Sequence, residues 1–482
     1  MSRMLAPRLL TAVLMLLMGV AHAAPVAGQP DTELPPAVAA KLVKASVPVD
    51  ALSVVITPVG TPSTPILRVN GDQSQNPASV AKLITTVAAL DALGSDFTWF
   101  TDFHYTGRIE RHRLIGNLHI RGGGDPKFVV ERIQEVMQTL RTRGITTIQG
   151  NMVLDNSAFD LPQAGPGDFD GEVLRPYNVQ PDALMVNFKS VVLKFKPNTK
   201  RGVAEIEVEP PMAGLNVPAT IPLRKGRCGD WRTHIRATLT EASRYRFAGG
   251  YPRACGEQEW GIAYIEPDTY ASKALLGIWQ SVGGKLTGQV VNGRVPATAK
   301  LLLRAPSLPL REIIMDVNKF SNNMMAQQVF LTLALSPDRP ATYDGARQKI
   351  QRWWVQSMGN TTAVPTIDNG SGLSRDGRIT ADALVALLQH AATHPQFKDF
   401  YDSLSIAGVD GTVSRMGQDG STPLSIGNAR LKTGSLKDVS AIAGYVTGMS
   451  GKTYAIAAMV NHDNAAKARA ALYQLVEWAA AH

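Results

Sequence analysis

Hydrophobic residues recur at two different spacings along this chain. Apolar side chains three and four residues apart indicate amphipathic helices, whereas alternation of apolar and polar side chains indicates strands. The helical spacing predicts helices at Ser79–Gly94, Tyr270–Ser281, Leu310–Asn318, Met324–Leu335, Thr342–Met358, Thr380–His394 and Lys467–Ala480. Alternation near the two ends of the chain predicts strands at Ser53–Thr57, Pro65–Asn70, Ala429–Ser435, Ser440–Val446 and Thr453–Val460.

Strands at both chain ends around a helical middle predict one α/β domain whose sheet is completed by the two termini. Between the first predicted helix and the others, the alternating pattern typical of strands dominates. Strands are predicted there at Phe97–Tyr105, Arg113–Arg121, Ile145–Leu154 and over most of 185–260, with one helix at Val129–Arg143. We therefore expect a domain formed by residues 24–95 and 266–482, interrupted at 96–265 by a β-rich insertion of two small lobes.

The first 23 residues have the pattern of a secretory signal peptide. Arg3 and Arg8 precede an apolar run from Leu9 to Ala21, and Ala21-His22-Ala23 provides small residues at the expected cleavage site. The run is shorter than the roughly 20 residues that span a bilayer, and no later segment is apolar enough to do so. We expect an exported protein with a mature chain that begins near Ala24.

Composition and charge say little about the fold, but they limit the cellular environments and partners that suit the protein. Of 482 residues, 44% are hydrophobic and 18% charged, which suits a globular chain with a large core. The formal net charge of +9 suits an anionic neighbourhood such as a cell envelope. Since the chain is expected to be exported, we expect no nucleic-acid partner.

The two cysteines, Cys228 and Cys255, are expected to form a disulfide in an oxidising compartment. Closing this 28-residue loop stabilises the fold by about 3.6 kcal/mol in the loop-entropy account. There is no CxxC pair, and two thiols are too few for a structural zinc site. His390 and His394 lie four residues apart on a predicted helix, but without the Glu of a metalloprotease motif they indicate a surface helix. We expect no metal and no cofactor.

One tetrad carries chemistry: Ser79-Val80-Ala81-Lys82. Three residues apart on a helix, the Ser79 hydroxyl and the Lys82 amine share one face. A neutral amine could accept the hydroxyl proton, but this requires the lysine pKa to fall from about 10.4 towards 7, through burial and a second nearby cation. The tetrad alone is a weak signal.

Two further motifs follow the tetrad in the chain. Lys432-Thr433-Gly434 lies on a predicted strand and supplies the second cation, and Ser321-Asn322-Asn323 lies between two predicted helices. The set S-x-x-K, S-x-N and K-T-G, in this order, resembles that of β-lactamases and penicillin-binding proteins. The long interval between the first two motifs is similar to the layout of class C low-molecular-mass penicillin-binding proteins, the serine-type D-alanyl-D-alanine carboxypeptidase/endopeptidase family.

Four further phrases are similar to those of that family: Arg121–Pro126, Asp155–Phe159, Asp368–Arg375 and Ala407–Thr412. One departure is visible, because Asn322 replaces the Asp of S-D-N. The resemblance implies a β-lactamase/transpeptidase-like domain, with an antiparallel sheet flanked by helices and a large β-rich insertion after the nucleophile helix.

The resemblance also implies an activity in the periplasm on peptidoglycan stem peptides, with β-lactams as covalent inhibitors. Ser79 would attack the carbonyl of the penultimate D-alanine, with Lys82 as the base. The backbone N–H groups of Ser79 and Ser435 would form the oxyanion hole. The remaining assignments are Ser321, Asn323 and Lys432 in proton transfer and substrate binding, Thr433 and Gly434 against the substrate backbone or carboxylate, and Arg375, Asp155 and Phe159 in stem-peptide binding.

Arg375 and Asp155 each have a simpler structural interpretation, and two other functions for the protein remain open. Arg375 could be a surface turn residue, and Asp155 could be a turn former that ends a strand. A β-lactamase or esterase would share the three motifs, and a non-catalytic muropeptide-binding scaffold would tolerate their loss. The sequence does not determine the oligomeric state.

Overall fold

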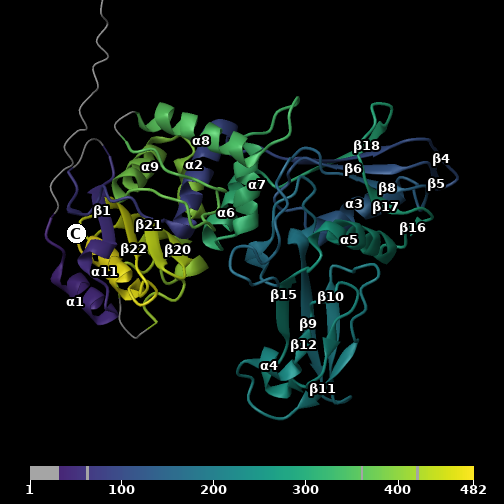
Figure 1. Ribbon diagram of the computed structural model, residues 1–482, viewed down its shortest axis with the longest axis horizontal. Coiled ribbons are helices and arrows are strands. Elements are labelled where there is room, and N and C mark those ends of the chain that lie inside the picture. The colour runs from purple at the N-terminus through teal and green to yellow at the C-terminus, as the bar shows by residue number, and fades with distance from the viewer. Residues whose placement is uncertain (1–31, 61–63, 360–361, 419–422) are drawn as a thin grey trace, which may run out of the picture.

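The computed structural model describes residues 32–60, 64–359, 362–418 and 423–482. A main domain that contains both ends of the described chain lies beside an inserted region with an upper and a lower lobe (Figure 1). The expected signal peptide, residues 1–23, lies outside the described residues. No described helix is long and apolar enough to cross a membrane.

The main domain is built on a six-stranded antiparallel sheet in the order β19-β20-β21-β22-β1-β2. Its strands are β1 (Leu52–Pro58), β2 (Leu67–Val69), β19 (Ser405–Ile406), β20 (Ala429–Leu436), β21 (Val439–Thr447) and β22 (Thr453–Asn461). The N-terminal β1 pairs with the C-terminal β22 from Leu52 opposite Val460 to Pro58 opposite Tyr454. The predicted α/β class, with one sheet completed by both chain ends, is confirmed.

Helices cover both faces of this sheet. Helices α1 (Pro36–Ala45) and α11 (Arg469–Ala480) cover one face, and α2 (Lys82–Leu93), α6 (Leu310–Lys319), α7 (Asn323–Thr332), α8 (Tyr343–Met358), α9 (Ala381–Thr393) and α10 (Phe397–Ser403) form the other layer. Because side chains alternate along a strand, Val54 and Ile56 enter the α1–α11 core while Val55 enters the other. The sequence pattern did not predict α1, which follows Pro35, or the seven-residue α10.

The upper lobe of the insertion contains two sheets, ordered β17-β8-β6-β3-β18 and β16-β7-β5-β4. Its elements are β3 (Phe100–Tyr105), β4 (Arg108–Glu110), β5 (Arg113–Ile115), β6 (Leu118–Gly122), α3 (Val130–Thr142), β7 (Thr147–Gln149), β8 (Met152–Asp155), α5 (Pro267–Ser281), β16 (Lys285–Leu286), β17 (Val290–Asn292) and β18 (Lys300–Pro306).

The predicted return to the main domain at residue 266 is therefore wrong. Helix α5 shares a core with the insertion, where Tyr270, Leu275 and Trp279 are buried. Strand β18 then pairs with β3, so the insertion continues to about Pro306. Helical periodicity at Tyr270–Ser281 identified the helix, but periodicity does not specify which core the apolar face enters.

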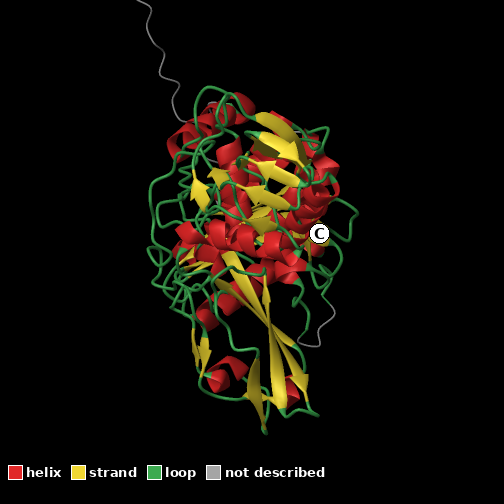
Figure 2. Cartoon of the chain, turned by 90° about the vertical axis from the view of Figure 1, so that its right-hand side faces the viewer, coloured by secondary structure: helices red, strands yellow, loops and turns green. Residues whose placement is uncertain are grey.

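The lower lobe is a five-stranded sheet in the order β14-β11-β10-β9-β15, which projects from the rest of the molecule (Figures 1 and 2). Its elements are β9 (Ser190–Asn198), β10 (Val203–Glu209), β11 (Thr220–Arg224), α4 (Trp231–Ile235), β12 (Ala237–Thr238), β13 (Arg246–Phe247), β14 (Tyr251–Pro252) and β15 (Gln258–Ala263). Cys228 and Cys255 are joined in a disulfide, with their Cα atoms 4.7 Å apart. Phe195, Trp231 and Tyr251 pack ring against ring beneath it.

Helix α2 is tied at its far end to the helices that surround it. The Asp91 carboxylate accepts hydrogen bonds from Trp353 Nε1 (2.8 Å) and His390 Nε2 (2.7 Å), and His394 Nε2 lies 3.2 Å from its other oxygen. The two histidines thus bind one half-buried carboxylate, contrary to the surface helix expected from their spacing. No group of residues suited to a metal occurs in the described part of the chain.

We predict that Asp91→Asn lowers the free energy of unfolding by about 1–3 kcal/mol above pH 4, because it weakens a partly buried charged hydrogen-bond centre. Burial raises the pKa of Asp91, but bonds from His390 and Trp353 and the nearby imidazolium charges outweigh it and lower the pKa overall. A depressed carboxyl pKa stabilises the fold above the unfolded value near 3.9, and this is lost as pH falls through the folded value. Denaturant unfolding between pH 2.5 and 5.5 should show the difference between wild type and variant shrinking with acidity. A constant difference would contradict this.

Candidate active site

Ser79 lies in a single 3₁₀ turn, η2 (Ala78–Ala81), that leads directly into α2. Lys82 is the first residue of α2, three positions after Ser79, so both side chains lie on the same side of the helix. Lys82 Nζ lies 3.0 Å from Ser79 Oγ. Ala78 has a φ of +45°, a conformation that non-glycine residues rarely adopt. The predicted nucleophile and base therefore meet at a locally strained turn.

Contacts from distant parts of the chain hold this turn. Asn76 and Asn461 exchange hydrogen bonds, with the Asn76 N–H donating to Asn461 Oδ1 (2.7 Å) and Asn461 Nδ2 donating to the Asn76 carbonyl (3.0 Å). Asn76 Oδ1 accepts from the Ala78 N–H (2.8 Å). A Cβ on Gly372 would lie 1.9 Å from the Ala78 carbonyl oxygen, so only glycine permits this approach. Nothing in the sequence pattern pointed to Asn76 or Asn461.

The Lys82 amine is completely buried and surrounded by neutral acceptors. Besides Ser79, its Nζ contacts Asn323 Oδ1 (2.7 Å) and the Ser371 carbonyl (2.5 Å), and no described carboxylate pairs with it. Burial, together with the charge of Lys432, holds the pKa of Lys82 well below its ordinary value. A neutral Lys82 has a lone pair available for the Ser79 proton. Asn322, in contrast, caps α7 through the Met325 N–H and does not contact either amine.

Lys432 forms the second half of the site. Its Nζ donates to Ser321 Oγ (2.9 Å) and to the Thr433 carbonyl (2.7 Å). Burial lowers the pKa of Lys432 to about 7. Ser321 is itself held at a φ of +57° between α6 and α7. The three motifs, up to 353 positions apart in the chain, thus converge on one polar cluster.

Strand β20 presents an open edge to this cluster. Its outer neighbour β19 pairs only with Arg430 and Leu431, so residues 432–436 have no strand partner on that side among the described segments. The Thr433 carbonyl points towards Lys432 Nζ. In a strand the N–H and C=O groups of residues i and i+2 point the same way, so the Ser435 N–H also faces the cluster. Gly434 lets β20 pass close to Ser79, because a Cβ there would lie 3.0 Å from the Ser79 nitrogen.

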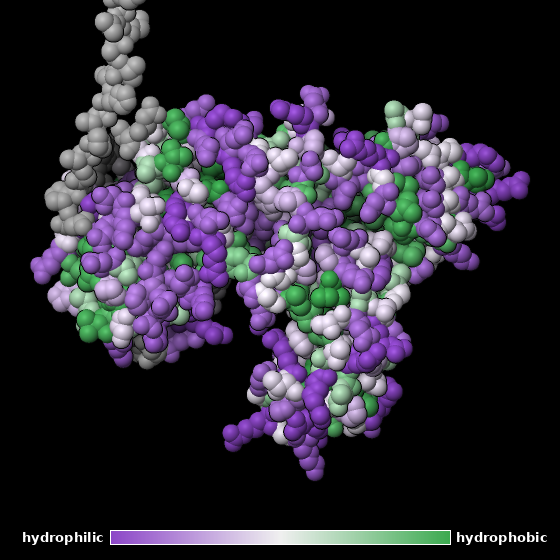
Figure 3. Space-filling view, in the orientation of Figure 1, coloured by the Kyte–Doolittle hydropathy of each residue, from purple (hydrophilic) through white to green (hydrophobic). Residues whose placement is uncertain are grey.

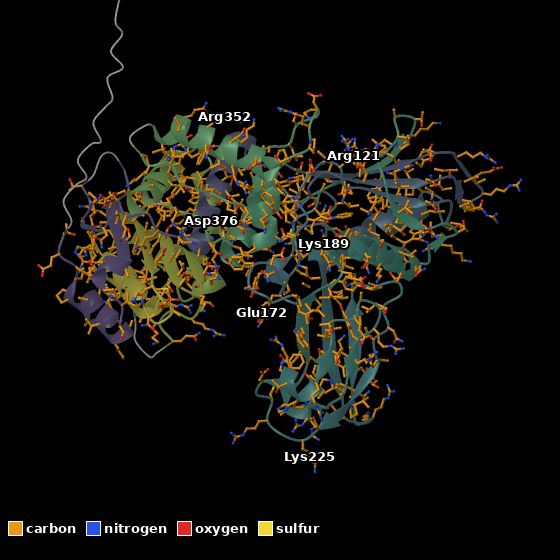
Figure 4. The ribbon with its side chains drawn as sticks, viewed as in Figure 1. Arg121, Glu172, Lys189, Lys225, Arg352 and Asp376 are labelled. Atoms are coloured by element: carbon orange, nitrogen blue, oxygen red, sulfur yellow. A yellow bond between two sulfur atoms is a disulfide. The ribbon has the colours of Figure 1, made fainter. Side chains whose placement is uncertain are left out.

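A loop of the insertion, residues 162–178, reaches the main domain beside this cluster, and we call it the strap. The Tyr177 carbonyl accepts a hydrogen bond from Asn323 Nδ2 (3.2 Å). Phe169 lies 4.9 Å from the Arg375 guanidinium, which also pairs with Asp438 (3.2 Å). Glu172 of the strap lies between the main domain and the lower lobe (Figure 4). Phe169, Tyr177 and Asp438 were not identified from the sequence.

Asp155 and Phe159 do not join the cluster. Asp155 is 3% exposed and accepts hydrogen bonds from the backbone N–H groups of Ser157 (3.0 Å) and Val295 (2.8 Å), as a turn former that ends β8 would. Phe159 packs with Ala183, Leu331 and Ala341. The structure therefore places the two residues in roles within the fold.

The phrases Arg121–Pro126 and Asp155–Phe159 instead contribute to a cleft of about 590 Å³ between the upper lobe and the segment that follows α7. Arg121, Arg294 and Arg304 also line it. Arg304 is already paired through both nitrogens with Asp102, at 2.7 and 2.8 Å. These segments thus lie where the upper lobe meets the main domain.

A family model and two curated relatives that match this chain carry the name of D-Ala-D-Ala carboxypeptidase or its family. Residues 34–482 match the profile of the D-Ala-D-Ala carboxypeptidase 3 (S13) family. The D-alanyl-D-alanine carboxypeptidase DacB of Haemophilus influenzae is 27% identical over 400 residues, covering 81% of each chain. The D-alanyl-D-alanine carboxypeptidase of Actinomadura sp. strain R39 is 26% identical over 404 residues, covering 80% of this chain and 73% of that one.

Solved structures share the fold. The crystal structure of penicillin binding protein 4 (dacB) from Haemophilus influenzae superposes with a TM-score of 0.72 at 24% identity, covering 91% of this chain and 99% of that one. The Bd0816 predatory endopeptidase from Bdellovibrio bacteriovorus gives a TM-score of 0.52 at 14% identity, covering 89% and 92%. The main domain and its large insertion thus recur together.

We predict that Lys432→Met makes the protein more stable at pH 7, by up to about 4 kcal/mol, because an amine with a depressed pKa is removed from the interior. The unfolded chain binds the Lys432 proton below about pH 10.4, but the folded chain binds it only below about pH 7. Wild-type stability should therefore rise with pH between these values, and the variant should show a shallower rise. Denaturant unfolding at several pH values measures both. The exposed neighbour Lys437→Met serves as the control, and an unchanged slope in Lys432→Met would refute the assignment.

Proposed function

Because this chain belongs to the D-Ala-D-Ala carboxypeptidase 3 (S13) family, we propose that Ser79, Lys82, Ser321, Asn323 and Lys432 are its catalytic residues. The protein is a serine-type D-Ala-D-Ala carboxypeptidase of the class C low-molecular-mass penicillin-binding type, acting on peptidoglycan and binding β-lactams. We propose that it can also act as an endopeptidase. The observation that supports the assignment of residues is the 3.0 Å contact between the Ser79 hydroxyl and a completely buried amine that has no described carboxylate partner.

Acylation begins with attack of Ser79 Oγ on the carbonyl carbon of the penultimate D-alanine. Lys82 Nζ takes the hydroxyl proton as the C–O bond forms. The negative charge that develops on the carbonyl oxygen is held by the N–H groups of Ser79 and Ser435, and losing one such donor typically costs about 10²- to 10³-fold in rate. The geometry on β20 supports this because the Ser435 N–H faces the cluster.

The leaving amine of the terminal D-alanine needs a proton when the C–N bond breaks. Ser321 Oγ, bonded to Lys432 Nζ at 2.9 Å, is positioned to deliver it, with Lys432 as the supply. Water then hydrolyses the ester at Ser79 and restores the free enzyme. Lys432 has given its proton to the amine, so the proton that Lys82 took from Ser79 must pass on to Lys432. Lys82 is then neutral again, takes a proton from the attacking water and returns it to Ser79 Oγ as the ester breaks.

Substrate binding uses the open edge of β20. An extended peptide laid along Thr433 to Ser435 would add a strand to the sheet, as in β-augmentation. Thr433 Oγ1 contacts Thr412 Oγ1 (2.8 Å), so its hydroxyl lies beside a residue of the Ala407–Thr412 phrase. Asn323 and Arg375 line the same region and would bind the substrate amide and a stem-peptide carboxylate. Asp155 and Phe159 have no part in this proposal.

We also propose export to the periplasm with cleavage after Ala23. The arginines and apolar run of residues 1–21 support this, as does the disulfide, which is typical of oxidising compartments.

We predict that Ser79→Ala abolishes the covalent adduct with benzylpenicillin and lowers D-alanine release by more than about 10³-fold. Intact-mass spectrometry detects the adduct, and D-alanine release from a pentapeptide and cleavage of a cross-linked dimer measure the two activities. Ser450→Ala, at the β21–β22 turn, is the matched control. Labelling of Ser79→Ala would refute the nucleophile. Rapid release of the drug by wild type would favour a β-lactamase, and no adduct at all a scaffold.

We predict that Arg375→Gln raises KM for a stem pentapeptide about 3- to 10-fold with little change in kcat, since a surface guanidinium that binds a carboxylate contributes mainly to ground-state binding. Steady-state kinetics on the pentapeptide and acylation by benzylpenicillin should be compared. Arg352→Gln, on the exposed face of α8, is the control. A fall in kcat with unchanged KM would contradict the role.

A further inference from the structure

The positive charge of this protein is concentrated in the lower lobe, mostly towards its free end. Residues 220–256, here called the basic tip, contain eight Lys or Arg against Asp230 and Glu241, a net charge of +6. The whole chain carries +9, of which the signal peptide accounts for +2. The rest of the mature chain is therefore almost neutral, so the basic excess belongs to this part of the lower lobe.

All eight cations of the basic tip are exposed: Arg224, Lys225, Arg227, Arg232, Arg236, Arg244, Arg246 and Arg253. Among the described residues, only Arg246 has an acidic partner, Glu241 at 3.0 Å. The other seven have no ion pair in the described part of the chain. Their charge is therefore not neutralised within the fold and acts on whatever lies outside.

The tip is also built to be rigid. The Cys228–Cys255 disulfide closes most of it into a loop, and Tyr251 Oη donates to the Gly256 carbonyl (2.8 Å). Arg232 lies over two indole rings, 5.6 Å from the centre of both Trp231 and Trp260. A pre-ordered surface loses little conformational entropy on binding, which favours a binding role over a loose solubilising tail.

The position of the tip suits contact with an extended surface. Lys225 lies at the free end of the lower lobe (Figure 4), and hydrophilic side chains project there into open space (Figure 3). Arg224, Lys225, Arg227 and Arg253 lie at the convex free end of the lobe, whereas Arg244 lies nearer to α5. None of the eight cations lines a described cavity. A convex cationic surface without a pocket cannot enclose a small ligand, but it can lie against a charged plane.

We propose that the basic tip docks this protein on an anionic phospholipid bilayer. The arginines and the lysine would lie among the headgroup phosphates, with which guanidinium groups form paired hydrogen bonds. Each basic residue near an anionic leaflet strengthens binding by about fivefold. Exposed charges are screened within about 10 Å at 0.1 M salt, so docking is reversible and salt-sensitive.

Co-sedimentation of the full mature chain with vesicles tests this proposal. Wild type should bind vesicles with 30% phosphatidylglycerol in phosphatidylcholine, fail to bind pure phosphatidylcholine, and lose at least tenfold in affinity between 50 and 300 mM NaCl. The variant Arg224→Gln, Lys225→Gln, Arg227→Gln and Arg253→Gln should bind at least tenfold more weakly. The control Lys44→Gln, Lys349→Gln, Arg352→Gln and Arg469→Gln removes the same charge from exposed main-domain sites and should bind as wild type does.

Four outcomes would overturn the docking proposal: equal binding to neutral vesicles, no binding by wild type, equal loss in both variants, or preference for a soluble anionic polysaccharide over vesicles. Benzylpenicillin acylation and circular dichroism of each variant confirm that it folds. Vesicle binding needs no turnover, so this result stands independently of the assigned catalytic residues.

Discussion

The site depends on the burial of two amines for which the described residues supply no counter-ion. Lys82 and Lys432 are each fully removed from water, and their partners are hydroxyl, amide and carbonyl oxygens. Burying a charge without a partner is costly, so the fold favours the neutral amine over the ammonium ion. The same arrangement that lowers stability at neutral pH therefore supplies a base next to Ser79. The fold is thus less stable because of these buried amines, and one of them, Lys82, provides the nitrogen lone pair that the reaction needs.

The rest of the main domain serves to hold that arrangement in place. Helix α2 is fixed near its start by the Asn76–Asn461 pair and near its end by Asp91. Strand β20 can approach Ser79 only because Gly434 has no side chain. The strap adds a contact from the insertion through the Tyr177 carbonyl, so the insertion contributes to the position of Asn323. Small displacements in any of these elements would separate the hydroxyl from its base.

The sequence predicted most of the main-domain elements and the three motifs, since each rests on a local signal. Hydrophobic periodicity identified β20, β21 and β22, and residue order linked Ser79, Ser321 and Lys432. Features that depend on tertiary packing were missed: helix α5 was assigned to the wrong core, and Asn461, Phe169 and Tyr177 gave no local signal. Asp155 was predicted as a binding residue from its sequence motif, and its carboxylate accepts hydrogen bonds from two backbone N–H groups that the sequence did not indicate.

The pairing of β1 with β22 has a consequence for how this protein is made. Leu52 lies opposite Val460, and β21 and β22, which connect β20 to β1 in the sheet, come from residues 439–461. The sheet beneath Ser79 cannot close until the residues of β22, up to Asn461, have left the ribosome. Contacts this far apart in sequence form slowly, because the intervening chain must first be ordered. Slow closure would keep the newly made chain unfolded and inactive for longer, which is the state that the proposed export would need for passage through a translocation pore.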